Sequence, residues 1–104
     1  MEMYRDLFPG FVKVHLLYHA VKGRISGVEM SSELARHGYS ISPGTLYPTL
    51  RKLEREGYLK SWNGVEGGRR RVYYTATAKG RRALEKARAQ TLELVREIME
   101  DQEV

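Results

Sequence analysis

Apolar residues recur at helical spacing through the middle of the chain. Leu46, Leu50 and Leu53 lie at positions i, i+4 and i+7, which places them on one side of a helix that repeats every 3.6 residues. The other side carries a basic set, Arg51, Lys52 and Arg55. The pattern therefore predicts a helix over residues 43–56 with a buried leucine seam and a cationic outer face.

The ends of this helix have residues suited to them. Ser42 is a favourable N-cap residue, and Pro43 fits the first helical position, where a missing N–H costs nothing. Gly57 is suited to end the helix. Pro48 cannot donate to the carbonyl of Gly44, so we expect a strained or slightly bent N-terminal half.

Two further helices are predicted upstream. The first covers residues 11–22, where Val14, Leu17 and Val21 form a core-facing stripe with Leu16 and Ala20 at its margin. The second covers residues 27–37, because Ser26 and Glu29 have capping-box spacing and Gly38 is suited to the C-terminal cap. We expect its inner face to consist of Val28, Ser31, Leu34 and Ala35.

Residues 58–75 alternate in character and are rich in aromatic side chains, which predicts two strands of a β-hairpin. We expect a loop over residues 63–68, too long for a tight two-residue turn. Helix, helix, helix and hairpin is the order of a winged helix-turn-helix. The predicted fold class is thus mainly α with a small β-hairpin, with the winged helix in residues 1–77 and a C-terminal dimerisation helix in residues 78–104 of one compact domain.

The C-terminal helix has a wide apolar face. Its positions Leu84, Ala87, Thr91, Leu94 and Ile98 step by three and four, and Leu92, Val95 and Met99 broaden the stripe. Such a face on a long helix predicts pairing with a second copy, and the alternative is packing on the first helix of the same chain. We expect the interface to consist of Phe11, His15, Tyr18, His19, Leu84, Ala87, Thr91, Leu94, Val95 and Ile98.

Charge narrows the class of partner. The 104 residues carry a formal net charge of +5, and residues 40–82 alone hold ten Lys/Arg against three Asp/Glu. A concentrated basic block indicates a polyanion, and nucleic acid fits better than a membrane because no segment pairs a basic face with a large apolar one. No stretch has the length of a membrane span or of a signal-peptide core, so we expect a soluble cytoplasmic protein.

No catalytic motif or cofactor-binding motif is present in the sequence, so we expect neither an enzyme nor a cofactor. His15 and His19 have the i, i+4 spacing of paired metal ligands, but there is no cysteine and His37 is an uncertain third ligand. We therefore expect interface or surface histidines here and no metal site.

The run GTLYPTLRKLEREGYL, with ISGVEMSSEL before it and GGRRRVYYTATAKGRRAL after it, resembles the PadR-like transcriptional regulators. Leu46, Tyr47 and Pro48 match the family's signature, and Tyr73, Tyr74 and Thr77 match its strand-to-helix junction. Ala76 departs from the larger aliphatic residue that is usual there. The resemblance, to the short subfamily with a single C-terminal helix, implies a homodimer that binds operator DNA, and it also implies that a small-molecule effector is to be considered.

We expect a sequence-specific repressor that binds a palindromic operator in double-stranded DNA, with one basic helix of each subunit in the major groove. The expected DNA-binding residues are Ser42, Gly44, Thr45, Tyr47, Pro48, Thr49, Arg51, Lys52 and Arg55 on the helix, and Lys60, Arg69, Arg70 and Arg71 on the wing. Two alternatives stay open at this point, a winged helix used as a protein-interaction module and a DNA-coating protein without sequence preference.

Overall fold

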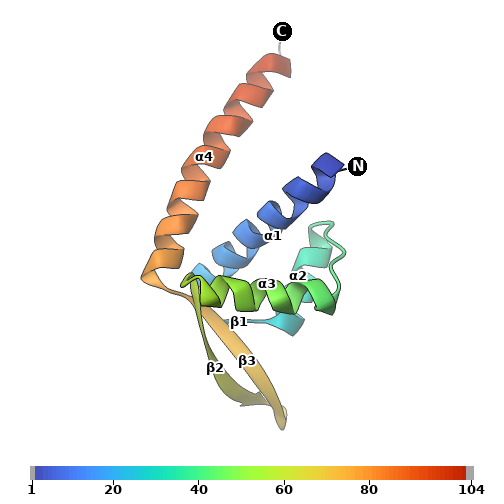
Figure 1. Cartoon of the computed structure of the whole chain (residues 1–104), viewed down its shortest axis with the longest axis vertical. Coiled ribbons are helices and arrows are strands. Elements are labelled where there is room, and N and C mark those ends of the chain that lie inside the picture. Colours follow the sequence, from blue (N-terminus) through green and yellow to red (C-terminus); the bar gives the residue numbers. More distant parts are fainter. Residues whose placement is uncertain (1, 103–104) are drawn as a thin grey trace.

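The computed structural model describes the backbone of residues 2–102 and the side chains of residues 9–100. The elements in chain order are α1 (Glu2–Lys22), β1 (Ile25–Ser26), α2 (Gly27–Arg36), α3 (Pro43–Arg55), β2 (Leu59–Glu66), β3 (Arg69–Ala76) and α4 (Ala78–Gln102). The predicted fold class is confirmed, because the described residues form four helices and a small antiparallel sheet whose β2–β3 hairpin projects from the helices (Figure 1). None of the helices within the described residues has the length and apolar character needed to cross a membrane.

The sheet has three strands in the order β1-β3-β2. The sequence predicted only the hairpin, because β1 is two residues long and too short to show an alternating pattern. Ile25 pairs with Tyr74 and Ser26 pairs with Tyr73, so β1 fixes the base of the wing to the segment that joins α1 and α2.

The hairpin turn differs from our prediction. The strands continue through residues 63–66, and the register pairs Glu66 with Arg69, so the connection consists of Gly67 and Gly68 alone. Their φ angles are +58° and +78°, the left-handed values that a two-residue turn between twisted strands requires at both positions. The predicted six-residue loop was wrong because Asn63 and Gly64, which look like loop residues, lie inside β2.

The buried face of α1 is also rotated from the predicted one. Val12, Leu16 and Ala20 are the most buried side chains, whereas Val14 and Val21 are only partly buried. Apolar residues occur almost all round this helix, so the choice of stripe depends on what packs against it. The helix also starts at Glu2, well before the predicted residue 11. The prediction placed the start too late because Pro9 and Gly10 both have low helix propensity.

The seam of α3 was predicted correctly, with Leu46, Leu50 and Leu53 at most 3 % exposed. In α2 the buried residues are Gly27, Met30 and Leu34, while Val28 is 48 % exposed, which corrects our predicted inner face. The Ser26 hydroxyl accepts from the backbone N–H of Glu29 at 3.2 Å, as the capping-box spacing predicted.

Both α2 and α3 end in the same way. Gly38 and Gly57 have φ angles of +87° and +89°. The backbone N–H groups that follow donate back to the helix, from Tyr39 to the Leu34 carbonyl and from Tyr58 to the Leu53 carbonyl. This is the Schellman arrangement, for which glycine is the favoured residue. Each glycine thus fixes where its helix stops and the direction in which the chain leaves it.

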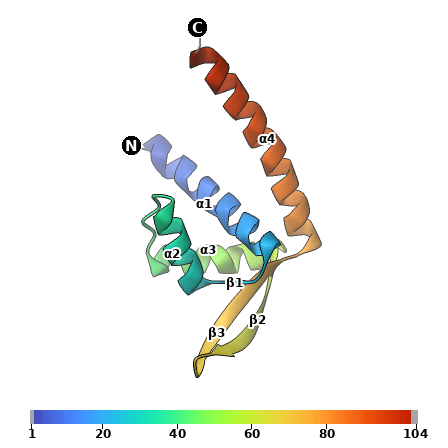
Figure 2. The same ribbon diagram turned by 180° about the vertical axis from the view of Figure 1, so that it is seen from behind.

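The last helix projects from the body of the molecule. Its first turns lie beside the C-terminal end of α1, and the two helices then diverge toward the chain termini (Figures 1 and 2). Leu84 is 4 % exposed and belongs to the core, whereas every described residue from Arg88 onward is exposed. The first turns of α4 are therefore packed against their own chain, whereas residues 88–100 remain exposed.

Candidate nucleic-acid interface

The residues of α3 opposite the leucine seam face solvent. The exposed positions comprise Ser42, Gly44, Thr45, Tyr47, Pro48, Arg51, Lys52 and Arg55, while Thr49 is half-buried. The Thr49 hydroxyl donates to the Thr45 carbonyl at 2.8 Å, so part of its hydrogen-bonding capacity is used within the helix. The Ser42 backbone carbonyl accepts from Thr45 and Leu46, but its hydroxyl makes no capping bond and lies 3.4 Å from the Thr45 hydroxyl. This leaves Ser42 at the predicted N-cap position without the predicted side-chain cap.

Tyr47 is positioned by a contact with α2. A Cβ atom added to Gly27 would overlap the Tyr47 ring, so the absence of a side chain at Gly27 lets the ring pack directly on the first turn of α2. Tyr47 remains 38 % exposed. The ring therefore has one side held by protein and the other available to a partner.

The wing carries its cations on both faces. Because successive side chains of a strand point to opposite faces, Arg70 lies on the face of Tyr74 and Ser61, which is turned toward α3. Arg69 and Arg71 lie on the other face, with Lys60 and Trp62 of β2. From the sequence we expected the three arginines to act as one group. The pleat of β3 instead places Arg70 on one face of the wing and Arg69 and Arg71 on the other.

A groove of about 480 Å³ joins α3 to the wing. Tyr47 and Arg51 line it from α3, Val28 from α2, and Arg70 and Val72 from β3. The structure thus brings together predicted DNA-binding residues that are about twenty positions apart in the chain. Val28 and Asn63 also line this groove and were missed, because Val28 was assigned to the core and Asn63 to a loop.

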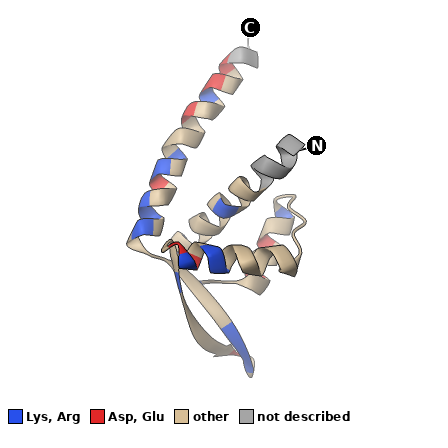
Figure 3. Cartoon of the chain, viewed as in Figure 1, with Lys and Arg blue, Asp and Glu red and all other residues tan. Residues whose placement is uncertain are grey.

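The cations of this region lack acidic partners. Among the described side chains, the ion pairs within 4.0 Å do not include Arg51, Lys52, Arg55, Lys60, Arg69, Arg70 or Arg71. Figure 3 shows basic residues on α3, toward the end of the wing and along the first half of α4, whereas acidic residues gather in the second half of α4. Unpaired cations on a groove and a projecting hairpin form a surface that attracts a polyanion.

The angle between α3 and the wing is fixed by hydrogen bonds. The Ser61 hydroxyl of β2 donates to the Glu54 carboxylate of α3 at 2.5 Å. At the next junction the Thr77 hydroxyl donates to the Gly57 carbonyl at 2.6 Å and accepts from the Gly80 N–H at 3.0 Å. Lys79 donates to the Glu56 carbonyl at 2.6 Å. These bonds link the end of α3, the start of β2 and the start of α4, so the basic helix and the projecting helix have a defined relative position.

Most of the predicted dimer residues are available in the single chain. Phe11 and Tyr18 are 48 % and 40 % exposed on α1, and Leu94, Val95 and Ile98 are 47–54 % exposed on α4, with Thr91 also exposed. Leu84 was expected at the dimer interface, but it is buried in the core of its own chain. It lies in the part of α4 that packs near α1 before the two helices diverge. Ala87 is half-buried at the transition.

A second groove, of about 680 Å³, lies between α1 and α4, with the end of α2 at one side. Val14 and Tyr18 line it from α1, and Leu92 and Val95 line it from α4. His15 and His19 also face it, as does His37 from α2. The sequence offered His37 only as an uncertain third ligand, because nothing in its local pattern predicts that α2 ends beside α1.

Three comparisons with known proteins bear on this surface. The model of the "Transcriptional regulator PadR-like family" matches residues 16–86. The Transcriptional regulator Rv3488 of Mycobacterium tuberculosis is 47 % identical over 95 residues, which cover 91 % of this chain and 89 % of that protein. Both matches include α3 and the wing.

Solved structures show the same fold. A PadR family transcriptional regulator from Eggerthella lenta superposes with a TM-score of 0.79 at 31 % identity, covering 95 % of this chain and 88 % of that one. Bacillus subtilis PadR, solved in complex with operator DNA, superposes with a TM-score of 0.66 at 26 % identity, covering 73 % of this chain and 45 % of that one.

Proposed function

This chain belongs to the PadR-like family of transcriptional regulators, and we propose that it is a repressor that binds a palindromic DNA operator as a homodimer. The observation that carries the proposal is the groove between α3 and the wing, which Arg51 lines from α3 and Arg70 lines from β3, neither of them in an ion pair within 4.0 Å among the described side chains. The operator complex of a structural relative supports DNA as the polyanion.

In this proposal the winged helix and the C-terminal helix have separate functions. Residues 1–77 bind DNA, with the exposed side chains of α3 near base edges in the major groove and the wing along the phosphate backbone. Residues 78–104 pair with a second copy, so that two copies of α3 lie about one helical turn of DNA apart. Repression then follows from occupation of the promoter.

Dimerisation is supported by the state of α4 in the single chain. Leu92, Leu94, Val95, Ile98 and Met99 are each 47–54 % exposed over about two turns of one helix. A contiguous apolar surface of this kind is typical of an interface. The open groove between α1 and α4 is the place where we propose that the partner's α4 packs, and any small-molecule effector would enter what remains of that groove.

The salt dependence of DNA binding tests the role of the wing. If the dimer neutralises about eight phosphates, log Kd changes with log salt with a slope near 7, and affinity falls about 10⁴-fold from about 50 to 200 mM salt. Arg70→Ala removes one contact from each subunit, so we expect this slope to decrease by about 2 and binding to weaken similarly on all sequences. Fluorescence anisotropy with labelled duplexes measures both quantities.

Arg96→Ala is the matched control, because it removes the same charge from the far half of α4. Its salt slope should equal that of the unaltered protein. If Arg70→Ala instead abolishes discrimination between sequences with an unchanged slope, the wing reads bases and the proposed division of tasks between α3 and the wing is wrong.

A further inference from the structure

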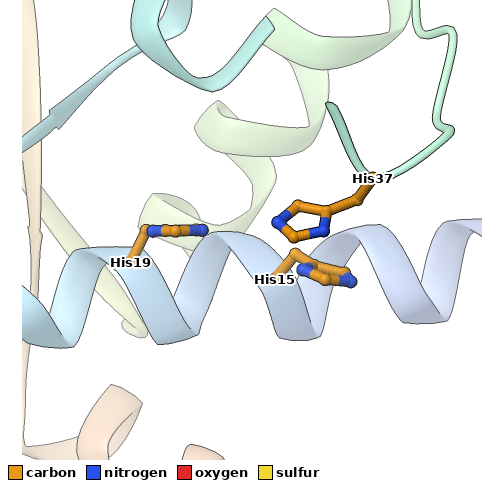
Figure 4. Close-up of side chains that lie close together, drawn as sticks. All are labelled: His15, His19 and His37. Carbon is orange, nitrogen blue, oxygen red and sulfur yellow. The ribbon is translucent and has the colours of Figure 1, made fainter. Parts of the chain in front are cut away.

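All three histidines of the chain lie in one cluster. His15 and His19 project from successive turns of α1, and His37 comes from the C-terminal cap of α2 and reaches over α1 (Figure 4). One nitrogen from each ring can be chosen so that the three atoms all lie within 4.8 Å of one another. Residues from two different parts of the chain thus present three imidazole nitrogens to a common space.

A carboxylate completes the cluster. Glu33 Oε2 lies 2.9 Å from His37 Nε2 and 3.6 Å from His19 Nε2. Neighbouring ligand atoms around a tetrahedral zinc ion are roughly 3.3 Å apart, given metal–ligand bonds of about 2.0 Å. The carboxylate oxygen is therefore already near ligand spacing from two of the histidines, and the nitrogen of His15 lies within 4.8 Å of the nitrogens of both.

We propose that His15, His19, His37 and Glu33 form a binding site for a single divalent transition-metal ion of the zinc type. Three imidazoles and a carboxylate are a donor set that zinc prefers, whereas calcium and magnesium prefer oxygen ligands alone. This proposal differs from our expectation from the sequence, where the absence of cysteine, the absence of a carboxylate at helical spacing between His15 and His19, and the uncertain role of His37 argued against a metal site.

The protonation states of the cluster favour a metal ion. Partial burial, followed by the charges of His37 and His19, lowers the pKa of His15, and partial burial also lowers the pKa of His19. Although desolvation opposes it, the hydrogen bond from His37 and the charge of Arg36 lower the pKa of Glu33. At neutral pH the two helix histidines are thus biased toward the neutral form and Glu33 toward the ionised form, which are the forms that bind a metal ion.

Basic side chains near the cluster would lower its affinity for a metal ion, but they do not occupy the space between the four ligands. Arg36 contacts Glu33 at 3.3 Å, but its side chain is 72 % exposed and free to turn toward solvent. Lys22 on α1 bonds the Tyr18 hydroxyl instead of the cluster, and Arg88 on α4 pairs with Glu85. The Tyr39 ring lies edge-on to His15, 5.2 Å between centroids, and closes one side of the cluster.

Cobalt(II) titration of the chelator-treated protein tests the site, because a tetrahedral cobalt centre absorbs visible light strongly whereas hydrated cobalt does not. We expect one cobalt ion per chain, with a tetrahedral spectrum that added zinc abolishes. His37→Ala should weaken binding about 100-fold or more, and Glu33→Gln about 10- to 100-fold. The His37 side chain is exposed and contacts Glu33 and the His15 ring, which do not belong to the hydrophobic core, so its replacement should leave the circular dichroism spectrum unchanged.

Glu29→Gln is the matched control, one turn before Glu33 on the same helix, and it should bind cobalt as the unaltered protein does. A spectrum that stays that of hydrated cobalt would overturn the proposal. So would equal affinity in the unaltered protein and both site variants, since the ion would then be bound elsewhere. Zinc should also raise the melting temperature of the unaltered protein and of Glu29→Gln, but not that of His37→Ala.

Discussion

At the scale of single residues, backbone conformation and close packing decide what each side chain does. Gly67 and Gly68 lie at the end of the loop predicted from the sequence, but only the positive φ angle of both shows that they form the whole turn. Gly27 was predicted as a helix start, whereas its second role, as the surface on which Tyr47 rests, depends on a contact with a different helix. Local sequence carries no information about such a neighbour.

The lowered pKa values of His15 and His19 make folding stability depend on pH. In the folded state the pKa of each group lies below its ordinary value of 6.5. The unfolded chain therefore takes up protons first as the pH falls. Their contribution is complete above pH 6.5 and is lost as the pH falls through the lowered folded values. We therefore expect urea midpoints, measured with a chelator present, to decrease from about pH 7.5 to about pH 5.5.

The double variant His15→Gln/His19→Gln should show a flatter pH profile over this range. Glu33, whose pKa is lowered from 4.5, acts at more acidic pH and is kept out of the measurement by staying above about pH 5.5. Stability that is constant or increases toward acid in the unaltered protein would contradict the assigned pKa directions.

At the scale of elements, the helices were more predictable than the sheet. The seam of α3 was readable because three leucines recur at one spacing among polar residues. The buried face of α1 was predicted wrongly because apolar residues lie on almost every side of this helix, and only packing determines which of them are buried. In α4 the apolar face was read correctly, but the division of that face between the core and the free half is set by where α4 leaves α1.

Sedimentation velocity tests the role of the free half of α4. We expect the unaltered protein to sediment as a dimer at micromolar concentration and Ile98→Glu to sediment as a folded monomer, because each buried carboxylate without a partner costs about 3 kcal/mol or more. Val65→Glu, at a wing position that is 73 % exposed, makes the same kind of change far from α4 and should remain a dimer. An unaltered protein that is a folded monomer would show that this face does not pair.

At the scale of the whole molecule, the order of elements predicted the winged helix, and the structure adds the groove between α3 and the wing. What could not be predicted depends on contacts between distant segments: β1 pairing with β3, the histidine of α2 meeting two histidines of α1, and the wing arginines dividing between two faces. These features arise from topology and strand register, which single-residue patterns do not encode. In the proposed dimer, pairing through α4 would duplicate one cationic groove.

Selection of bound fragments from random double-stranded DNA tests that arrangement most directly. The account predicts enrichment of an inverted repeat whose half-sites are centred about one helical turn apart, since each half-site corresponds to one copy of α3 in the dimer. Bound DNA without an enriched sequence would indicate a DNA-coating protein, and an absence of bound DNA would indicate a protein-interaction module. Either of these results would contradict the account.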